Sequence, residues 1–183
     1  MGRLENVLLA IDTYNRNDPQ GREFLYSDKL TQWVLRLNPS PSEALRIAAR
    51  GQHIGRWTIP RQSFPMNRGG YLRWREELKR FHAKTVGELM AKENYLESEI
   101  DAVRQIILKK NFQFNPDAQT VEDALCLIFL ESQFEELHQK TPDPKMIDII
   151  QKTWKKMSAK AKEVALTLEL PAHHKELIQE ALR

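Results

Sequence analysis

The apolar residues of this chain recur at intervals of three and four along nearly its whole length, and this spacing constrains the fold more than any other feature. Leu4, Val7, Leu8 and Ile11 show the pattern first. No stretch alternates apolar and polar residues as a half-buried strand does. The sequence therefore predicts an all-α protein. Its 183 residues, 41% of them hydrophobic, are enough to bury the core of one domain.

About eight helices follow from this spacing and from the helix-breaking residues between them. The third has the strongest start signal, because Ser40, Pro41 and Glu43 combine an N-cap serine, a first-position proline and a carboxylate three residues after the cap. The sixth, over residues 121–130, is apolar on nearly every side and should lie in the middle of the bundle. We expect the helices at about residues 4–17, 30–37, 41–53, 70–92, 97–110, 116–130, 145–157 and 171–183 of a single domain, 1–183.

Composition indicates the cellular compartment in which the protein resides. The single cysteine, Cys126, lies in an apolar run and has no disulfide partner, which fits a reducing compartment. No apolar run approaches the roughly 20 residues that span a bilayer, and the N-terminus lacks the pattern of a secretory signal. We therefore expect a cytoplasmic protein without a membrane partner. The sequence does not indicate an oligomeric state.

Positive charge is concentrated in residues 50–80, which hold eight basic and two acidic residues, whereas the whole chain carries a net charge of only +3. Such local excess indicates an anion site. Between residues 54 and 67 the helical spacing stops and Pro60 and Pro65 occur. Since Trp57, Phe64 and Met66 would bury, we predict a packed loop that fixes its arginines in place.

Polar side chains interrupt three apolar faces. Gln52 and His53 continue the inward stripe of the third helix, Asp123 precedes the most apolar run of the chain, and His82 follows Phe81. Each also has a structural explanation. A backbone carbonyl or the dipole of its own helix can satisfy a core histidine, and a carboxylate in a first turn can simply cap its helix or pair with an arginine.

Three further histidines lie near predicted helix ends. His138 stands alone, and the adjacent His173 and His174 should not face one point on a helix. We predict no site from them.

Residues Ala49 to Arg56 resemble the helix end A-x-L-H-D-I-G-K of the HD superfamily of helical phosphohydrolases. Gln52 stands at the family's histidine position and His53 at its aspartate position, and no histidine precedes His53. The resemblance implies an HD-like core with a degenerate metal motif, in which His53, His82 and Asp123 with water would hold a divalent metal. The metal would polarise a phosphoryl oxygen or activate water.

A second resemblance covers more of the chain. It is to an uncharacterised all-helical family of bacteria and fungi, some of whose members carry the label glutamyl-tRNA synthetase; nothing here resembles the nucleotide-binding signatures of that enzyme. The two resemblances are compatible with one lineage. The motifs that carry the second resemblance are Gln52-His53, Arg56-Trp57, Ile59-Pro60-Arg61, Pro65-Met66, Arg68, Tyr71, Trp74-Arg75, Glu122-Asp123-Ala124, Leu127 and Phe129-Leu130-Glu131.

Two functions from different classes remain open. The first is binding of a small phosphorylated or nucleotide ligand, with hydrolysis of a phosphate ester at His53 and Asp123. The second is a non-catalytic module for nucleic acid or an acidic partner. The modest net charge favours the small ligand. In the structural alternative, Arg61 or Arg75 pairs with Glu76, Glu77, Asp123 or Glu131 inside the fold. The predicted ligand-binding residues are Gln52, Arg56, Trp57, Arg61, Arg68, Tyr71, Trp74 and Arg75.

Overall fold

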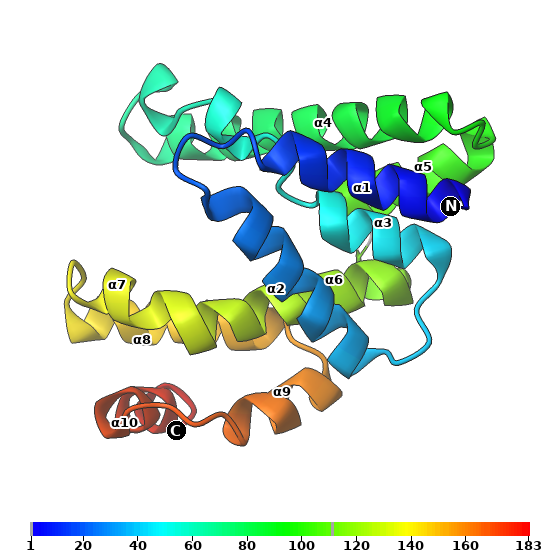
Figure 1. Ribbon diagram of the computed structural model, residues 1–183. Coiled ribbons are helices and arrows are strands. Elements are labelled where there is room, and N and C mark those ends of the chain that lie inside the picture. Colours follow the sequence, from blue (N-terminus) through cyan, green and yellow to red (C-terminus); the bar gives the residue numbers. More distant parts are fainter. Residues whose placement is uncertain (1, 111) are drawn as a thin grey trace. The chain divides into compact units, whose positions relative to one another are not determined.

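The computed structural model describes residues 2–110 and 112–183 and is helical throughout, with no strand among these residues (Figure 1). The chain divides into two compact units, Met1–Val121 and Glu122–Arg183. The prediction of an all-α fold is confirmed. The expectation of one domain over 1–183, and of an HD-like core within it, stays a prediction.

In the N-terminal unit, the short helix α3 (Glu43–Gly51) contacts four others. Residues 47–51 are all buried, so α3 is the centre of this unit. The helices that surround it are α1 (Arg3–Asn15), α2 (Arg22–Leu37), α4 (Arg68–Lys92) and α5 (Glu97–Leu108).

The start of α3 differs from the predicted one. Ser42, not Ser40, is the N-cap, and its Oγ accepts a hydrogen bond from the Leu45 amide at 3.0 Å. The same Oγ donates to Asp117 Oδ2 at 2.6 Å. A serine side chain with this second partner is fixed in the capping position, and the helix begins two residues later than expected.

The connection between α3 and α4 is ordered, as predicted. It contains two 3-10 turns, Arg56–Thr58 and Arg61–Ser63. Gly55 starts the first turn with φ +64°, and a Cβ there would lie 2.8 Å from ring atoms of both Phe81 and Tyr14. Only glycine fits this backbone shape and this close approach. The predicted packing is only partly realised, because Trp57 and Phe64 are half-buried and Met66 is 75% exposed.

Helix α6 (Pro116–Ile128) starts in the N-terminal unit and ends in the C-terminal one. Its buried run is confirmed, since only Leu125 and Phe129 of residues 121–130 are not fully buried. In the C-terminal unit, α8 and α10 contact one another. The elements that follow α6 are a π-helical turn (Phe129–Gln133), α7 (Phe134–His138), α8 (Asp143–Lys156), α9 (Ala159–Leu166) and α10 (Ala172–Ala181).

The described residues thus form ten α-helices rather than about eight. The two additional helices are the short α7 and α9. Helix α9 has no strong apolar stripe, but Ser158 caps it by accepting from the Ala161 amide at 3.2 Å. None of the described helices combines the length and the apolar character that crossing a bilayer requires.

Candidate functional site

His53 lies in the turn that follows α3 and is held by α2. Its ring stacks on Tyr26, with centroids 4.5 Å apart and planes 11° apart. Its Nδ1 lies 4.0 Å from Glu23 Oε2. The His53 side chain is 21% exposed, so the predicted inward orientation is only partly realised. No hydrogen bond holds the ring among the residues described, which does not fit a core histidine satisfied by a carbonyl.

Glu23 is the group that the sequence interpretation missed. It lies in the first turn of α2, whose start is already capped by Asp18, because Asp18 Oδ2 accepts from the Arg22 and Glu23 amides at 2.8 and 3.0 Å. Positions 23, 27, 30, 34 and 37 share one face of α2, and the last four are buried. This spacing was the signal that Glu23 faces inward.

Burial sets the protonation of this pair. It raises the pKa of Glu23 to about 7, against the opposing effect of the positive charge of Arg56. Burial, and then the charges of Arg56 and His82, lower the pKa of His53 well below its ordinary value. At neutral pH, His53 is therefore uncharged and Glu23 is poised between its two forms.

His82, on α4, is the second buried histidine of this region, and its ring centroid lies 5.9 Å from that of His53. Its Nδ1 lies 2.7 Å from the Ile54 carbonyl oxygen, so Nδ1 carries the proton and donates it. Burial lowers the pKa of His82 to about 4. Its Nε2 is buried and has no hydrogen-bond partner among the described residues.

Three of the predicted arginines gather over two aromatic rings. The Arg56 guanidinium lies 4.7 Å from the centre of the Trp74 ring, Arg75 lies 5.8 Å from that of Tyr71, and Arg61 lies 5.9 Å from both. The two rings are themselves 5.9 Å apart. We name Arg56, Arg61, Tyr71, Trp74 and Arg75 the arginine–aromatic cluster.

Among the described residues of the N-terminal unit, no ion pair neutralises the positive charges of this cluster. Among the described residues of this unit, none of its three arginines lies within 4.0 Å of a carboxylate oxygen, so the expected pairing of Arg61 or Arg75 with Glu76 or Glu77 is not formed. Pairing with Asp123 or Glu131, which belong to the C-terminal unit, stays a prediction. Arg61 instead donates to the carbonyls of Phe64 and Pro65 at 3.0 and 2.8 Å, which fixes the loop.

Arg50, from the same basic segment, shows the contrasting case. Its guanidinium donates to Asp12 Oδ2 and to Asp28 Oδ1, each at 2.8 Å. This arginine is a structural cross-link between α1, α2 and α3. Within one stretch of sequence, Arg50 therefore has two carboxylate partners, whereas Arg56, Arg61 and Arg75 have none among the described residues of this unit.

The remaining predicted ligand-binding residues are dispersed. Gln52 is buried and donates to the Ile107 carbonyl at 3.3 Å, while its Oε1 has no hydrogen-bond partner among the described residues. Trp57 lies 5.9 Å from Tyr14, and Arg68 is exposed at the start of α4. Trp74 is buried and donates through Nε1 to the Ile59 carbonyl at 2.8 Å, which leaves Tyr71, 42% exposed, as the accessible ring of the cluster.

Asp123 has structural partners within its own unit. Its Oδ1 accepts from the Ser158 amide at 2.8 Å and its Oδ2 accepts from the Ser158 hydroxyl at 2.5 Å. The carboxylate thus fixes the residue that caps α9. A common centre for His53 and Asp123 stays a prediction.

For a divalent metal, the neutral imidazoles of His53 and His82 are suitable donors, and the unpartnered Nε2 of His82 is the stronger indication. Two histidines fall short of the three protein ligands that catalytic zinc sites use. The predicted ligand set of His53, His82 and Asp123 is not complete within the N-terminal unit, because Asp123 belongs to the other unit, and the metal stays a prediction.

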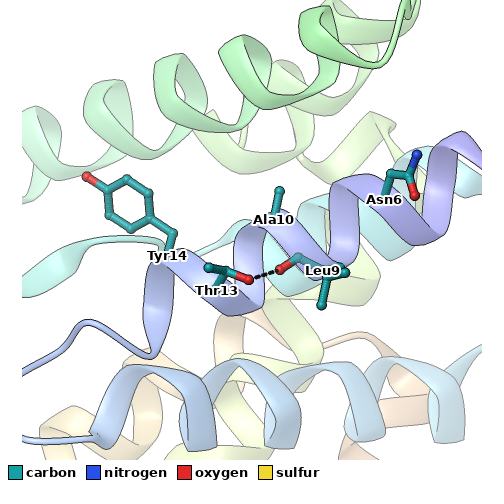
Figure 2. Close-up of a pocket in the computed structure, with 5 residues that line it drawn as sticks. All are labelled: Asn6, Leu9, Ala10, Thr13 and Tyr14. Atoms are coloured by element: carbon teal, nitrogen blue, oxygen red, sulfur yellow. Dashed lines mark hydrogen bonds between the residues drawn. The ribbon is translucent and has the colours of Figure 1, made fainter.

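A hollow of about 440 Å³ runs along α1 (Figure 2). It ends at Tyr14, which also contacts Trp57 of the loop. Its lining residues are Asn6, Leu9, Ala10, Thr13 and Tyr14. Since none of these side chains carries a charge, the hollow by itself offers nothing to bind a phosphate.

Comparison with known proteins places the chain in a family. No curated protein and no solved structure matches it. Residues 5–178 match the family described as Domain of unknown function (DUF4202), and the match includes both units. The chain belongs to the DUF4202 family.

Proposed function

We propose that the protein binds a small phosphorylated or nucleotide ligand at the arginine–aromatic cluster, and that Glu23 and His53 exchange protons with it there. The observation that carries the proposal is the convergence of Arg56, Arg61 and Arg75 on the two rings without an ion-paired carboxylate among the described residues of their own unit. Guanidinium groups held by aromatic packing make preorganised, two-pronged contacts to phosphate.

The electrostatics of Arg56 support this reading. Burial lowers its pKa, the charge of Glu23 acts to raise it, and the charge of Arg75 acts to lower it further. The positive charges of Arg56 and Arg75 repel one another, and an anion bound between them would stabilise both. A phosphate would supply that negative charge, and Glu23 could then take up a proton at neutral pH.

Tyr71 supports a ligand that carries a ring. Its side chain is exposed, lies beside Arg75, and forms a tilted pair with the buried Trp74. A nucleobase can stack on such a ring while neighbouring arginines hold its phosphates. The footprint of one loop and the first turns of α4 suits a nucleotide better than a long polyanion.

Glu23 and His53 supply the acid–base chemistry that hydrolysis needs. A carboxyl group with a pKa of about 7 transfers protons efficiently at neutral pH, and a neutral imidazole can accept one. The proposal therefore assigns proton transfer to this pair and anion binding to the arginines. It does not require Asp123.

The test is calorimetric titration of the full chain with ATP and with inorganic phosphate. Arg56→Ala should weaken binding by about 10- to 100-fold, because a charge-assisted hydrogen bond is lost. Arg80→Ala is the control, since Arg80 lies on α4 like Arg75 of the cluster, is 69% exposed and pairs only with Glu76 among the described residues. It should bind like the wild type.

Phosphate release from ATP then separates catalysis from binding. Glu23→Gln and His53→Ala should abolish release while the ligand still binds. Equal weakening by Arg56→Ala and Arg80→Ala would contradict the proposed site. Binding of a single-stranded oligonucleotide that weakens linearly in log salt, without turnover of ATP, would favour the nucleic-acid module instead.

A further inference from the structure

Three histidines of the C-terminal unit come together although the sequence separates them by 35 residues. His138 ends α7, and His173 and His174 lie in the first turn of α10. One ring nitrogen of each lies within 4.8 Å of those of the other two. We name His138, His173 and His174 the histidine cluster. The expectation that the adjacent pair diverges is wrong, because both Nε2 atoms approach one oxygen, Glu135 Oε2.

Each imidazole of the cluster has a carboxylate beside its Nε2. Glu135 Oε2 lies 2.8 Å from His174 Nε2 and 3.4 Å from His173 Nε2, and Asp143 Oδ1 lies 2.7 Å from His138 Nε2. In protein metal sites, carboxylates in this relation orient the imidazole rings and raise their basicity. Since Glu135 Oε2 faces the Nε2 atoms, it would hold the two rings from outside the ligand set and leave their Nδ1 atoms to the ion.

His174 adds an independent observation. The residue is 3% exposed, and its Nδ1 is buried without a hydrogen-bond partner among the described residues. A buried ring nitrogen normally has such a partner, so this one needs another explanation. A bound cation would satisfy it. His173, by contrast, has a side chain that is 51% exposed, which leaves the cluster a route to solvent.

We propose that the histidine cluster binds one divalent transition-metal ion, for which Zn²⁺ is the best match. Imidazole donors favour zinc, copper and nickel over magnesium and calcium. Tetrahedral zinc with Zn–N bonds of about 2.0–2.1 Å places its nitrogen ligands roughly 3.3 Å apart. The ring nitrogens, which lie up to 4.8 Å apart, would have to move closer together when the ion binds, and the exposed His173 side chain has room to do so. A water completes the four ligands.

The test is titration of Zn²⁺ into the full chain, prepared without an affinity tag and stripped with a chelator. Calorimetry and elemental analysis should both give one equivalent of zinc. His173→Ala and His138→Ala should each weaken binding by at least about 100-fold, and Glu135→Gln by about 10- to 100-fold. Circular dichroism in the presence of chelator should show that these variants remain folded.

His53→Ala is the control that separates this site from the metal predicted for the N-terminal unit. It should still bind one equivalent of zinc with unchanged affinity. Absence of zinc binding by the wild type would overturn the proposal. So would stoichiometric binding that persists in both His138→Ala and His173→Ala. Neither result bears on nucleotide binding at the arginine–aromatic cluster.

Discussion

Glu23 Oε2 lies 4.0 Å from His53 Nδ1, so α2 brings a carboxyl group of high pKa to a histidine of low pKa. Burial disfavours the charged form of both groups, so it raises the pKa of the carboxyl group and lowers the pKa of the imidazole. The pair is thus largely uncharged at mildly acidic pH. The stability of the protein therefore depends on pH through the protonation of Glu23 and His53.

Glu23→Gln should change how stability depends on pH. In the folded protein the pKa of Glu23 is raised from 4.5 to about 7, so the folded state binds more protons between these values. The stabilising contribution is complete below pH 4.5 and is lost as pH rises through 7. When the pH rises from 4 to 8, the unfolding free energy of the wild type should therefore fall by about 1–3 kcal/mol more than that of the variant. Urea denaturation at both pH values measures this, and parallel curves would contradict it.

His82→Asn should have the opposite signature. The pKa of His82 is lowered from 6.5 to about 4, so the unfolded state binds more protons between pH 4 and 6.5. Stability from this group is complete above 6.5 and is lost as pH falls through 4. Asparagine can still donate to the Ile54 carbonyl and does not titrate. The variant should lose less stability than wild type between pH 7 and pH 4, by about 1–3 kcal/mol, in the same denaturation assay. A ring resonance of His82 that titrates near pH 6.5 would disprove the lowered pKa.

Gly55→Ala should be more destabilising than Gly21→Ala. Both glycines have left-handed backbones, with φ +64° and +65°. A Cβ at Gly55 would meet Phe81 and Tyr14 at 2.8 Å, whereas a Cβ at Gly21 meets nothing within 4 Å. Backbone strain alone costs about 1 kcal/mol, and crowding adds about 1–3 kcal/mol. Thermal denaturation of the two variants measures the difference, and equal losses would show that the loop yields to the added methyl group.

Asp123→Ala should destabilise the protein by about 1.5–3 kcal/mol, because it removes an ionised acceptor from the Ser158 amide and hydroxyl. Ser158→Ala retains the amide donor and should cost less. Urea denaturation gives both values. If Asp123→Ala instead left stability unchanged and abolished phosphate release from ATP, Asp123 would belong to the chemical centre and not to the start of α9.

Much of the helical framework was predictable because apolar spacing reports directly on which face of a helix is buried. The buried run before Leu130 and the buried Gln52 both follow from it. The cap at Ser42 was not predictable, since the choice between two serines depends on Asp117, which is distant in sequence. Helix α9 does not follow from apolar spacing, because its apolar stripe is weak. The main signal for this helix is its N-cap, Ser158.

The candidate site divides in the same way. Arg56 and Trp74 could be predicted because the basic, aromatic-rich segment is local in sequence. Glu23 could not be assigned a role, because only the fold brings α2 to the turn after α3. Ideal helix geometry predicts that the adjacent His173 and His174 do not face one point. Helix geometry gives the direction in which each side chain leaves the helix axis. It does not show that two imidazole rings from adjacent positions can turn toward the same carboxylate, as they do at Glu135.

The π-helical turn at Phe129–Gln133 has a consequence for the histidines that follow it. Its hydrogen bonds join residues five apart rather than four, which inserts one residue into the helical count. Each inserted residue rotates everything after it by about 100° about the axis. The direction in which His138 points is therefore out of phase with the apolar repeat of α6. Deleting one residue from this turn would restore an uninterrupted helix and turn His138 away from His173 and His174. The histidine cluster therefore depends on the one extra residue in this turn.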